Sequence, residues 1–194
     1  MKKKKSFKRD LIEWAAFIGI IAVLYLTGLH APVFGFLQGL VLQTGLIKPK
    51  IELTSAAEAN YQFTLADEEG KRISFEQFRN QVIFINFWAT WCPPCLAEMP
   101  DIHDLYEKME GSGVQFVMIA LDDEFEKAIK YKKRKEYTFP VYRLASPLPQ
   151  AFKSSAIPTT FVVDTKGKIV VKKSGMAQYD SRKFRDFLRE LASS

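Results

Sequence analysis

Two cysteines, Cys92 and Cys95, are the only thiols in the chain, and two prolines separate them. Thiol-disulfide exchange needs a thiolate that attacks a disulfide and a second thiol that resolves the mixed disulfide. A Cys-x-x-Cys pair at the start of a helix supplies both, because unpaired N–H groups and the helix dipole lower the pKa of the first thiol. We therefore predict that Cys92 attacks and that Cys95, one turn further on, resolves.

The sequence on either side of the pair predicts the elements that position it. A run of apolar residues at 82–87, interrupted only by Asn86, predicts a buried central strand. A helix at 93–109 follows, and Pro93 is tolerated in its first turn because the missing N–H costs nothing there. A second buried strand at 114–121 completes a right-handed parallel unit.

The remaining pattern alternates strands and helices, which predicts one α/β domain with a mixed sheet flanked by helices. A chain of 194 residues with 47% apolar residues buries one substantial core. The further predicted elements are a hairpin at 62–65 and 72–73, a short helix capped by Ser74, a helix at 124–137, a strand at 141–144, a helical turn at 148–152, a hairpin at 160–163 and 169–173, and a closing amphipathic helix with Phe184, Phe187, Leu188 and Leu191 on one face.

The N-terminal end predicts a membrane anchor. A basic tail at 1–10 precedes an apolar segment at 11–30, which is long enough to span a bilayer. By the positive-inside rule, the tail stays cytoplasmic and the rest of the chain lies on the far, periplasmic side. We interpret 31–55 as an interfacial helix or linker and 56–194 as the catalytic domain.

Two other interpretations of this end remain. A cleaved signal peptide also has a basic start and an apolar stretch, but the residues 29–31 make a poor cleavage site. A helical hairpin would return the domain to the cytoplasm, but the second apolar stretch, 33–47, is short for a span and Pro32 leaves little room for a turn.

The net charge of +6 belongs mostly to the tail. Residues 1–47 contain six basic and two acidic residues, which leaves 22 basic and 20 acidic residues for the remainder. A domain with so little excess charge gives no support to nucleic-acid binding. The only histidines are His30 and His103, which are not clustered near the cysteines and do not complete a zinc site with them. We therefore predict neither a metal nor a cofactor.

Two separate motifs resemble the thioredoxin superfamily. They are FWATWCPPC at 87–95 and IPTT at 157–160. The resemblance implies that Pro158 is cis and lies beside the cysteines, and that Ile157 binds substrate through its backbone. It also implies that Trp91 and Pro93 lie at the surface that substrates contact.

Within the superfamily the chain is most similar to the membrane-anchored TlpA/ResA-type reductases. The anchor, an extra helix and strand between Asp122 and Pro158, and the position of Glu98 carry this resemblance. Asn86 stands where thioredoxin has a buried, proton-handling Asp, and an amide does not titrate. Glu98 follows Cys95 by three residues, and burial there raises a carboxyl pKa, so we predict that Glu98 manages proton transfer for the pair.

The resemblance implies an enzyme that exchanges disulfides with partner proteins outside the cytoplasm, in the reducing direction, for example in cytochrome c maturation. A thiol-disulfide donor, expected in the membrane, recycles it. The alternative is a copper-binding assembly module with the two thiolates as soft ligands, for which Met99 and Met176 are candidate partners. Cu(I) binding by the reduced domain without disulfide turnover distinguishes the two. A peroxidase is disfavoured, because the residues around Cys92 lack the Thr and Arg of a peroxidatic site.

Overall fold

The computed structural model describes residues 13–14, 19 and 57–194. The predicted tail at 1–10 and linker at 31–55, and nearly all of the predicted anchor at 11–30, lie outside the described residues. Within the part that is described, none of the helices has both the length and the apolar character that a membrane span requires.

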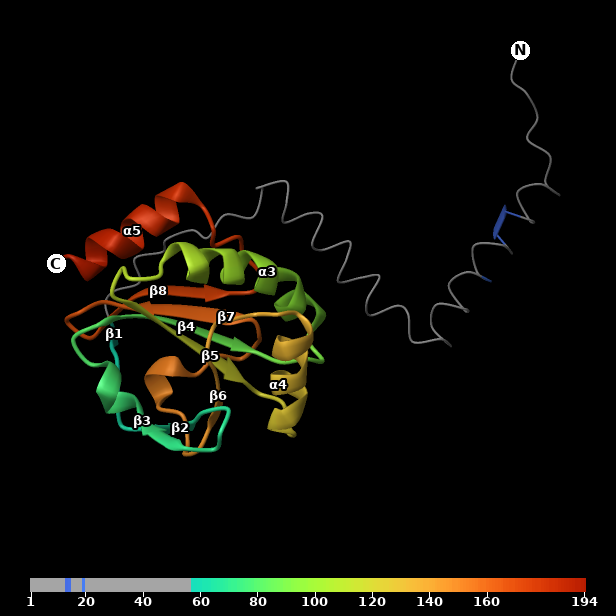
Figure 1. The fold of residues 1–194 in the computed structure, drawn as a ribbon, viewed down its shortest axis with the longest axis horizontal. Helices are drawn as coiled ribbons and strands as arrows, with labels where there is room; N and C mark the ends of the chain where they lie inside the picture. The colour runs from blue at the N-terminus through green and yellow to red at the C-terminus, as the bar shows by residue number, and fades with distance from the viewer. Residues whose placement is uncertain (1–12, 15–18, 20–56) are drawn as a thin grey trace, which may run out of the picture.

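The described residues form one eight-stranded sheet at the centre of the domain (Figure 1). Its strand order is β1-β8-β7-β4-β5-β6-β2-β3. The strands are β1 (Ala57–Glu58), β2 (Thr64–Ala66), β3 (Arg72–Ser74), β4 (Val82–Trp88), β5 (Val114–Ala120), β6 (Val141–Leu144), β7 (Thr159–Val163) and β8 (Lys168–Ser174). Strands β4, β5 and β6 run parallel, and the other neighbours pair antiparallel. The predicted mixed sheet is confirmed.

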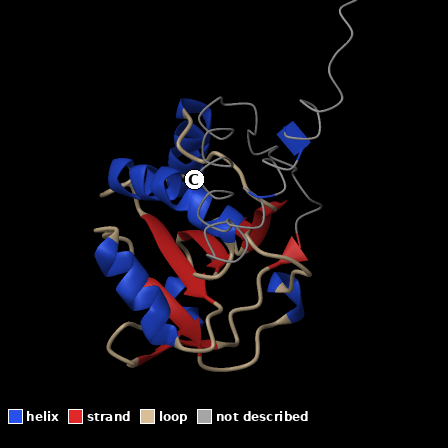
Figure 2. Cartoon of the chain, turned by 90° about the vertical axis from the view of Figure 1, so that its right-hand side faces the viewer, coloured by secondary structure: helices blue, strands red, loops and turns tan. Residues whose placement is uncertain are grey.

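Helices cover one face of the sheet, and short turns of 3-10 helix lie against the other. The helices are α3 (Pro93–Lys108), α4 (Phe125–Arg134) and α5 (Arg182–Ala192), and the short turns are η1 (Phe75–Phe78) and η2 (Gln150–Phe152). Figures 1 and 2 show α3 and α5 together over the central strands. Each face has its own cluster of buried apolar side chains, so the sheet divides the predicted core into two.

The central strand β4 is buried on both faces, which explains its unbroken apolar run. Successive side chains of a strand point to opposite faces. Phe84 and Trp88 accordingly pack in the cluster under α3, whereas Ile83 and Ile85 pack in the cluster on the other face. Asn86 has the same parity as Phe84, so its side chain lies on the face that α3 covers. A polar group is thus placed in the buried layer beneath the cysteines.

The predicted elements agree with the structure apart from their ends. The unit β4-α3-β5 is parallel, as expected. Helix α4 ends at Arg134 rather than at Tyr137, because Glu136 has a left-handed backbone with φ 57° and cannot continue a helix. Strand β1, which pairs with β8, was not predicted, because two residues are too short to show a pattern.

Candidate active site

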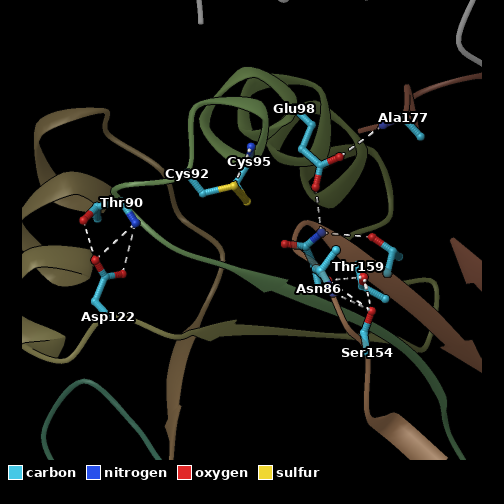
Figure 3. The surroundings of a disulfide bond; sticks show 11 residues. Asn86, Thr90, Cys92, Cys95, Glu98, Asp122, Ser154, Thr159 and Ala177 are labelled. Atoms are coloured by element: carbon cyan, nitrogen blue, oxygen red, sulfur yellow. Dashed lines mark hydrogen bonds between the residues drawn. A yellow bond between two sulfur atoms is a disulfide. The ribbon is translucent and has the colours of Figure 1, made fainter. Parts of the chain in front are cut away.

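Cys92 is the N-cap residue of α3, and Cys95 lies in the first turn (Figure 3). A disulfide with an S–S distance of 2.08 Å joins them. The backbone N–H of Cys95 also donates a hydrogen bond of 3.3 Å to the Sγ atom of Cys92. An N–H group that points at sulfur favours its charged form, so the helix start stabilises a thiolate on Cys92 once the disulfide is reduced. Pro93 occupies the first helical position, as predicted.

The two sulfurs differ in their access to solvent. Cys92 retains 4% of its surface, whereas Cys95 is fully buried. Next to them, Trp91 is 66% exposed and Trp88 is buried in the core. This arrangement fits the predicted roles, because the predicted attacking sulfur is the more accessible one and an exposed indole precedes it in the chain.

The second motif lies next to the first in space. The Ile157–Pro158 peptide bond is cis, which confirms the conformation predicted for Pro158. Pro158 is buried, and Ile157 packs against the apolar cluster that contains both cysteines. The carbonyl of Pro158 accepts a hydrogen bond of 2.8 Å from the N–H of Gly175, so the hairpin that follows holds this loop.

Glu98 is fully buried on the face of α3 that meets the sheet. Its Oε1 atom accepts a hydrogen bond of 2.8 Å from Nδ2 of Asn86, and its Oε2 atom accepts one of 3.2 Å from the N–H of Ala177. Burial raises the pKa of Glu98 to about 8, even though both hydrogen bonds act to lower it. Free thiols ionise in the same range, so the pKa of Glu98 fits the predicted role in proton transfer.

Asn86 connects the carboxyl group to the sheet. Its Nδ2 atom donates to Glu98 and, over 2.9 Å, to the Oγ1 atom of Thr160, which stands opposite Asn86 in the pairing of β4 with β7. The sequence pointed to Asn86 only as a residue that cannot titrate, and it gave no role to Thr160. Thr160 is the last residue of the cis-proline motif and pairs with a buried polar residue, which is the signal from which this contact could have been found.

A second carboxylate fixes the loop that leads to Cys92. Asp122 follows β5, and its oxygens accept hydrogen bonds of 3.1 and 3.2 Å from the N–H of Thr90 and a further one from the Thr90 hydroxyl. Asp122 is largely buried, at 9% exposure. Sequence reasoning missed this contact, because the two residues lie on separate loops that only the parallel strand pair brings together.

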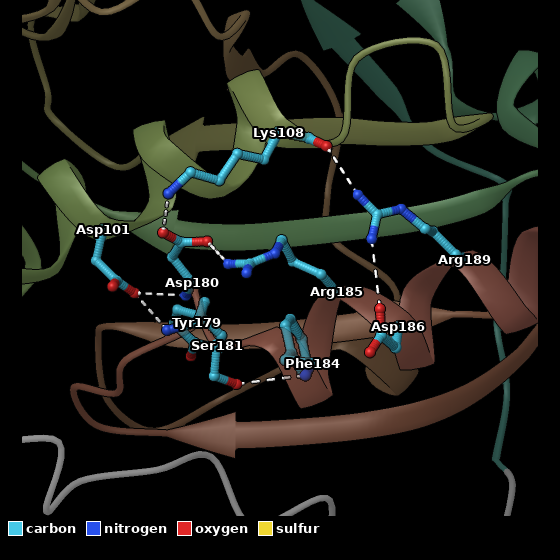
Figure 4. A network of polar contacts seen from close by, with 9 residues as sticks. All are labelled: Asp101, Lys108, Tyr179, Asp180, Ser181, Phe184, Arg185, Asp186 and Arg189. Atoms are coloured by element: carbon cyan, nitrogen blue, oxygen red, sulfur yellow. Dashed lines mark hydrogen bonds and ion pairs between the residues drawn. The ribbon is translucent and has the colours of Figure 1, made fainter.

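A polar network secures the loop that supplies the N–H of Ala177 (Figure 4). Asp101, one turn beyond Glu98 on α3, accepts hydrogen bonds from the N–H groups of Tyr179 and Asp180. Asp180 in turn forms ion pairs with Lys108 and Arg185. Two carboxyl groups of α3 therefore hold the segment after β8. They are those of Glu98 and Asp101, and Glu98 belongs to the candidate active site.

The described residues contain one group of side chains that could ligate a metal ion, and it does not include the cysteines. His103, Asp104 and Glu107 bring their ligand atoms within 4.8 Å of one another. Nε2 of His103 already accepts a hydrogen bond of 3.2 Å from the N–H of Thr138. Met99, a candidate partner for copper, is fully buried in the core.

A disulfide at a helix N-terminus, a cis-proline directly before β7 and a mixed sheet define a thioredoxin-like thiol-disulfide oxidoreductase. Comparison with known families agrees, because the model of the AhpC/TSA family matches residues 56–172. The chain belongs to the AhpC/TSA family.

A curated relative and one solved structure carry the same activity in their names, and a second solved structure shares the fold. A thiol-disulfide oxidoreductase ResA of Bacillus cereus is 36% identical over 137 residues, which cover 69% of this chain and 78% of the relative. A thiol:disulfide interchange protein of the thioredoxin family from Chlorobium tepidum TLS has a TM-score of 0.58 at 29% identity, covering 72% of this chain and 97% of its own. StoA from Bacillus subtilis has a TM-score of 0.52 at 27% identity, covering 66% and 94%.

Proposed function

We propose that this thiol-disulfide oxidoreductase reduces disulfides of partner proteins outside the cytoplasm, in reactions such as cytochrome c maturation. The hydrogen bond from the N–H of Cys95 to the Sγ atom of Cys92 is the observation that carries the proposal. It stabilises negative charge on the more accessible of the two sulfurs. The resemblance to the TlpA/ResA-type reductases supports the reducing direction, and the name of the curated relatives supports thiol-disulfide exchange.

The reaction consists of two exchanges. The thiolate of Cys92 attacks one sulfur of the partner's disulfide, that S–S bond breaks, and the other partner sulfur leaves as a thiolate that takes a proton from water. Cys95 then passes its S–H proton to the carboxylate of Glu98 and attacks the Sγ atom of Cys92. The mixed disulfide breaks, and the second partner sulfur leaves as a thiolate. The partner gains two electrons, and the enzyme keeps a Cys92–Cys95 disulfide.

The same proposal includes the location and the recycling of the enzyme. The apolar segment 11–30 after a basic tail supports a single membrane anchor with domain 56–194 on the far side. An enzyme that ends each cycle oxidised needs a dithiol donor, which we place in the membrane next to the anchor. The donor is oxidised as it returns two electrons and two protons to the cysteines.

Trapping of partners by single-cysteine variants of the full-length, anchored chain tests the function. Cys95→Ser leaves the attacking thiol and removes the resolving one, so mixed disulfides with partner proteins should accumulate and appear on non-reducing gels. Cys92→Ser, the matched control, should trap none. Equal trapping by both variants would contradict the assignment of roles, and the absence of any mixed disulfide would contradict exchange with proteins.

Labelling of intact cells tests the location. In the Cys95→Ser variant, Cys92 should react with a membrane-impermeant maleimide added to whole cells or spheroplasts. The Cys92→Ser variant controls for access, because its remaining thiol is buried. Labelling of Cys92 only after lysis would place the domain in the cytoplasm and overturn the proposed topology.

A further inference from the structure

The amide of Asn86 has a fixed orientation. A side-chain amide offers two N–H donors on nitrogen and one acceptor oxygen. Both donors are used, one to Oε1 of Glu98 at 2.8 Å and one to Oγ1 of Thr160 at 2.9 Å. When Glu98 is ionised, the reverse orientation would place the amide oxygen against a carboxylate oxygen, so the ionised carboxyl group favours the orientation in which Nδ2 faces Glu98. The neighbours of Asn86 therefore determine where its oxygen points.

That oxygen is buried and unused. Asn86 is fully buried, and no donor among the described residues reaches its Oδ1 atom. A buried acceptor without a partner is destabilising and is rare in native structures. The orphaned oxygen of Asn86 thus calls for a partner that another state of the protein supplies.

The oxygen points toward the cysteines. Figure 3 shows the nitrogen of Asn86 turned to Glu98 and the oxygen turned to the side on which the disulfide lies. Strand parity places Asn86 under α3, and on that helix Cys95 precedes Glu98 by three residues, so the two side chains lie one above the other. An amide that touches Glu98 therefore lies beneath the first two turns of α3, the part of the helix that carries Cys95.

We propose that Asn86 is a positioning residue for the resolving cysteine, and that in the reduced enzyme its Oδ1 atom accepts a hydrogen bond from the Sγ–H group of Cys95. The inference rests on the proposed function, because it concerns the dithiol state of that cycle. In the disulfide, the sulfur of Cys95 carries no hydrogen and has nothing to donate. A dithiol donor that reduces the S–S bond becomes a disulfide itself and passes one proton to each cysteine sulfur, which creates the missing donor.

With this contact the two sulfurs favour opposite protonation states. An amide oxygen favours the neutral thiol of Cys95, whereas the helix N–H groups favour the thiolate of Cys92. Cys95 then remains a thiol until Glu98 takes its proton. The charged and titratable groups that act on this site are Glu98 and Asp101 on α3, Lys173 on β8, and Tyr179 in the loop after β8.

Infrared spectroscopy of the S–H stretch tests the contact directly. The full-length Cys92→Ala variant has Cys95 as its only thiol, and Ala, unlike Ser, offers no competing oxygen. We expect its S–H band below the frequency of an unbonded thiol. Adding Asn86→Leu should return the band to the unbonded frequency. Adding Thr160→Val, the matched control, removes an acceptor of Nδ2 but leaves Oδ1 in place, so the band should stay where it is.

Two results would overturn the proposal. One is a band at the unbonded frequency in the Cys92→Ala protein itself, a measurement that does not depend on whether the Leu variant folds. The other is an equal shift in the Thr160→Val protein, which would indicate general disturbance of the core. Both are measured without a partner protein. The trapping experiment tests the proposed function and the infrared band tests the hydrogen bond, so the failure of one can be told from the failure of the other.

Thiol titration gives a second readout. Asn86 also donates to Glu98, so the titration is carried out with Glu98→Gln, which removes the neighbouring charge. In the Cys92→Ala, Glu98→Gln background, Asn86→Leu should increase the ionisation constant of Cys95 about tenfold, which corresponds to the loss of one neutral hydrogen bond. Thiolate absorbance against pH measures it, and an unchanged titration curve would contradict the contact.

Discussion

The backbone N–H of Ala177 donates a hydrogen bond of 3.2 Å to the Oε2 atom of Glu98, 79 residues earlier in the chain. Because Asn86 holds the other carboxyl oxygen, Glu98 is fixed between strand β4 and the loop after β8. The carboxyl group is thus enclosed by three separate parts of the chain, and its removal from water raises its pKa to about 8 although the two hydrogen bonds act to lower it. Its titration is a property of the assembled fold, and it leads to two predictions.

The first prediction concerns the rate of exchange. Glu98→Gln keeps the size of the side chain and removes its titration. In the wild type, resolution of the mixed disulfide should accelerate as the pH passes about 8, because the carboxylate then accepts the proton of Cys95. The variant should lack this step and be about 100-fold slower at high pH, a typical contribution of a general base. Stopped-flow exchange with a small disulfide across the pH range measures it. Glu110→Gln, at an exposed position, is the control, and coincident profiles for wild type and Glu98→Gln would remove Glu98 from the mechanism.

The second prediction concerns stability. The pKa of Glu98 is raised from 4.5 in the unfolded reference to about 8 in the folded protein. Between these values the folded chain keeps a proton that the unfolded chain releases, so the contribution of Glu98 to stability is greatest below about pH 4.5, falls as the pH rises, and levels off above about 8. The loss is on the order of 5 kcal/mol, at about 1.4 kcal/mol per pH unit.

Urea unfolding of the oxidised protein at a series of pH values checks this dependence. Glu98→Gln does not titrate, so its free energy of unfolding should decline less steeply across the same range. Glu110→Gln should follow the wild type. Parallel curves for wild type and Glu98→Gln would show that the carboxyl group ionises normally in the folded state.

The third prediction concerns the loop before Cys92. Asp122→Ala removes the acceptor for the N–H and hydroxyl of Thr90. We expect a loss of about 1.5–3 kcal/mol of stability, which is the usual contribution of hydrogen bonds to a charged group. Asp123→Ala changes an exposed neighbour and should have little effect. Thermal or urea unfolding of the two variants gives the comparison, and equal losses would mean that the Thr90 contact contributes nothing specific.

The fourth prediction concerns substrate contact. Trp91 keeps 66% of its surface exposed next to Cys92, although large aromatic side chains usually bury most of theirs. Trp91→Ala should raise the KM for a protein disulfide about tenfold, which corresponds to a modest aromatic anchor of about 1.4 kcal/mol. The rate with a small-molecule disulfide should stay the same, because such a substrate does not reach the indole. A parallel loss for both substrates would indicate that Trp91 supports the site rather than the partner.

Local patterns were sufficient to predict most of the fold. The apolar run of β4, the cap at Ser74 and the hairpin of β7 and β8 depend on neighbouring residues, and each lies where it was expected. The end of α4 was misplaced, because its Lys-rich sequence has good helix propensity up to the left-handed Glu136. Such a backbone conformation has no local signal when the residue is not Gly.

The residues of the candidate site that belong to a sequence motif could be predicted. The contacts between segments that lie far apart in the chain could not. The positions of Cys92, Cys95 and Pro158 follow from two short motifs, and the burial of Glu98 from helical spacing. The partners of Glu98 come from a different strand and from a loop near the C-terminus. No periodicity connects those segments in the sequence, and only the packed sheet shows that they meet.

The two outermost strands of the sheet, β1 and β3, have two and three residues. Their short length and the charged side chains Glu58 and Arg72 leave almost no free edge to which another chain can add a strand. Within the described residues, both rims of the sheet therefore disfavour strand addition by another chain, so contact with partner proteins is left to the surface around the disulfide.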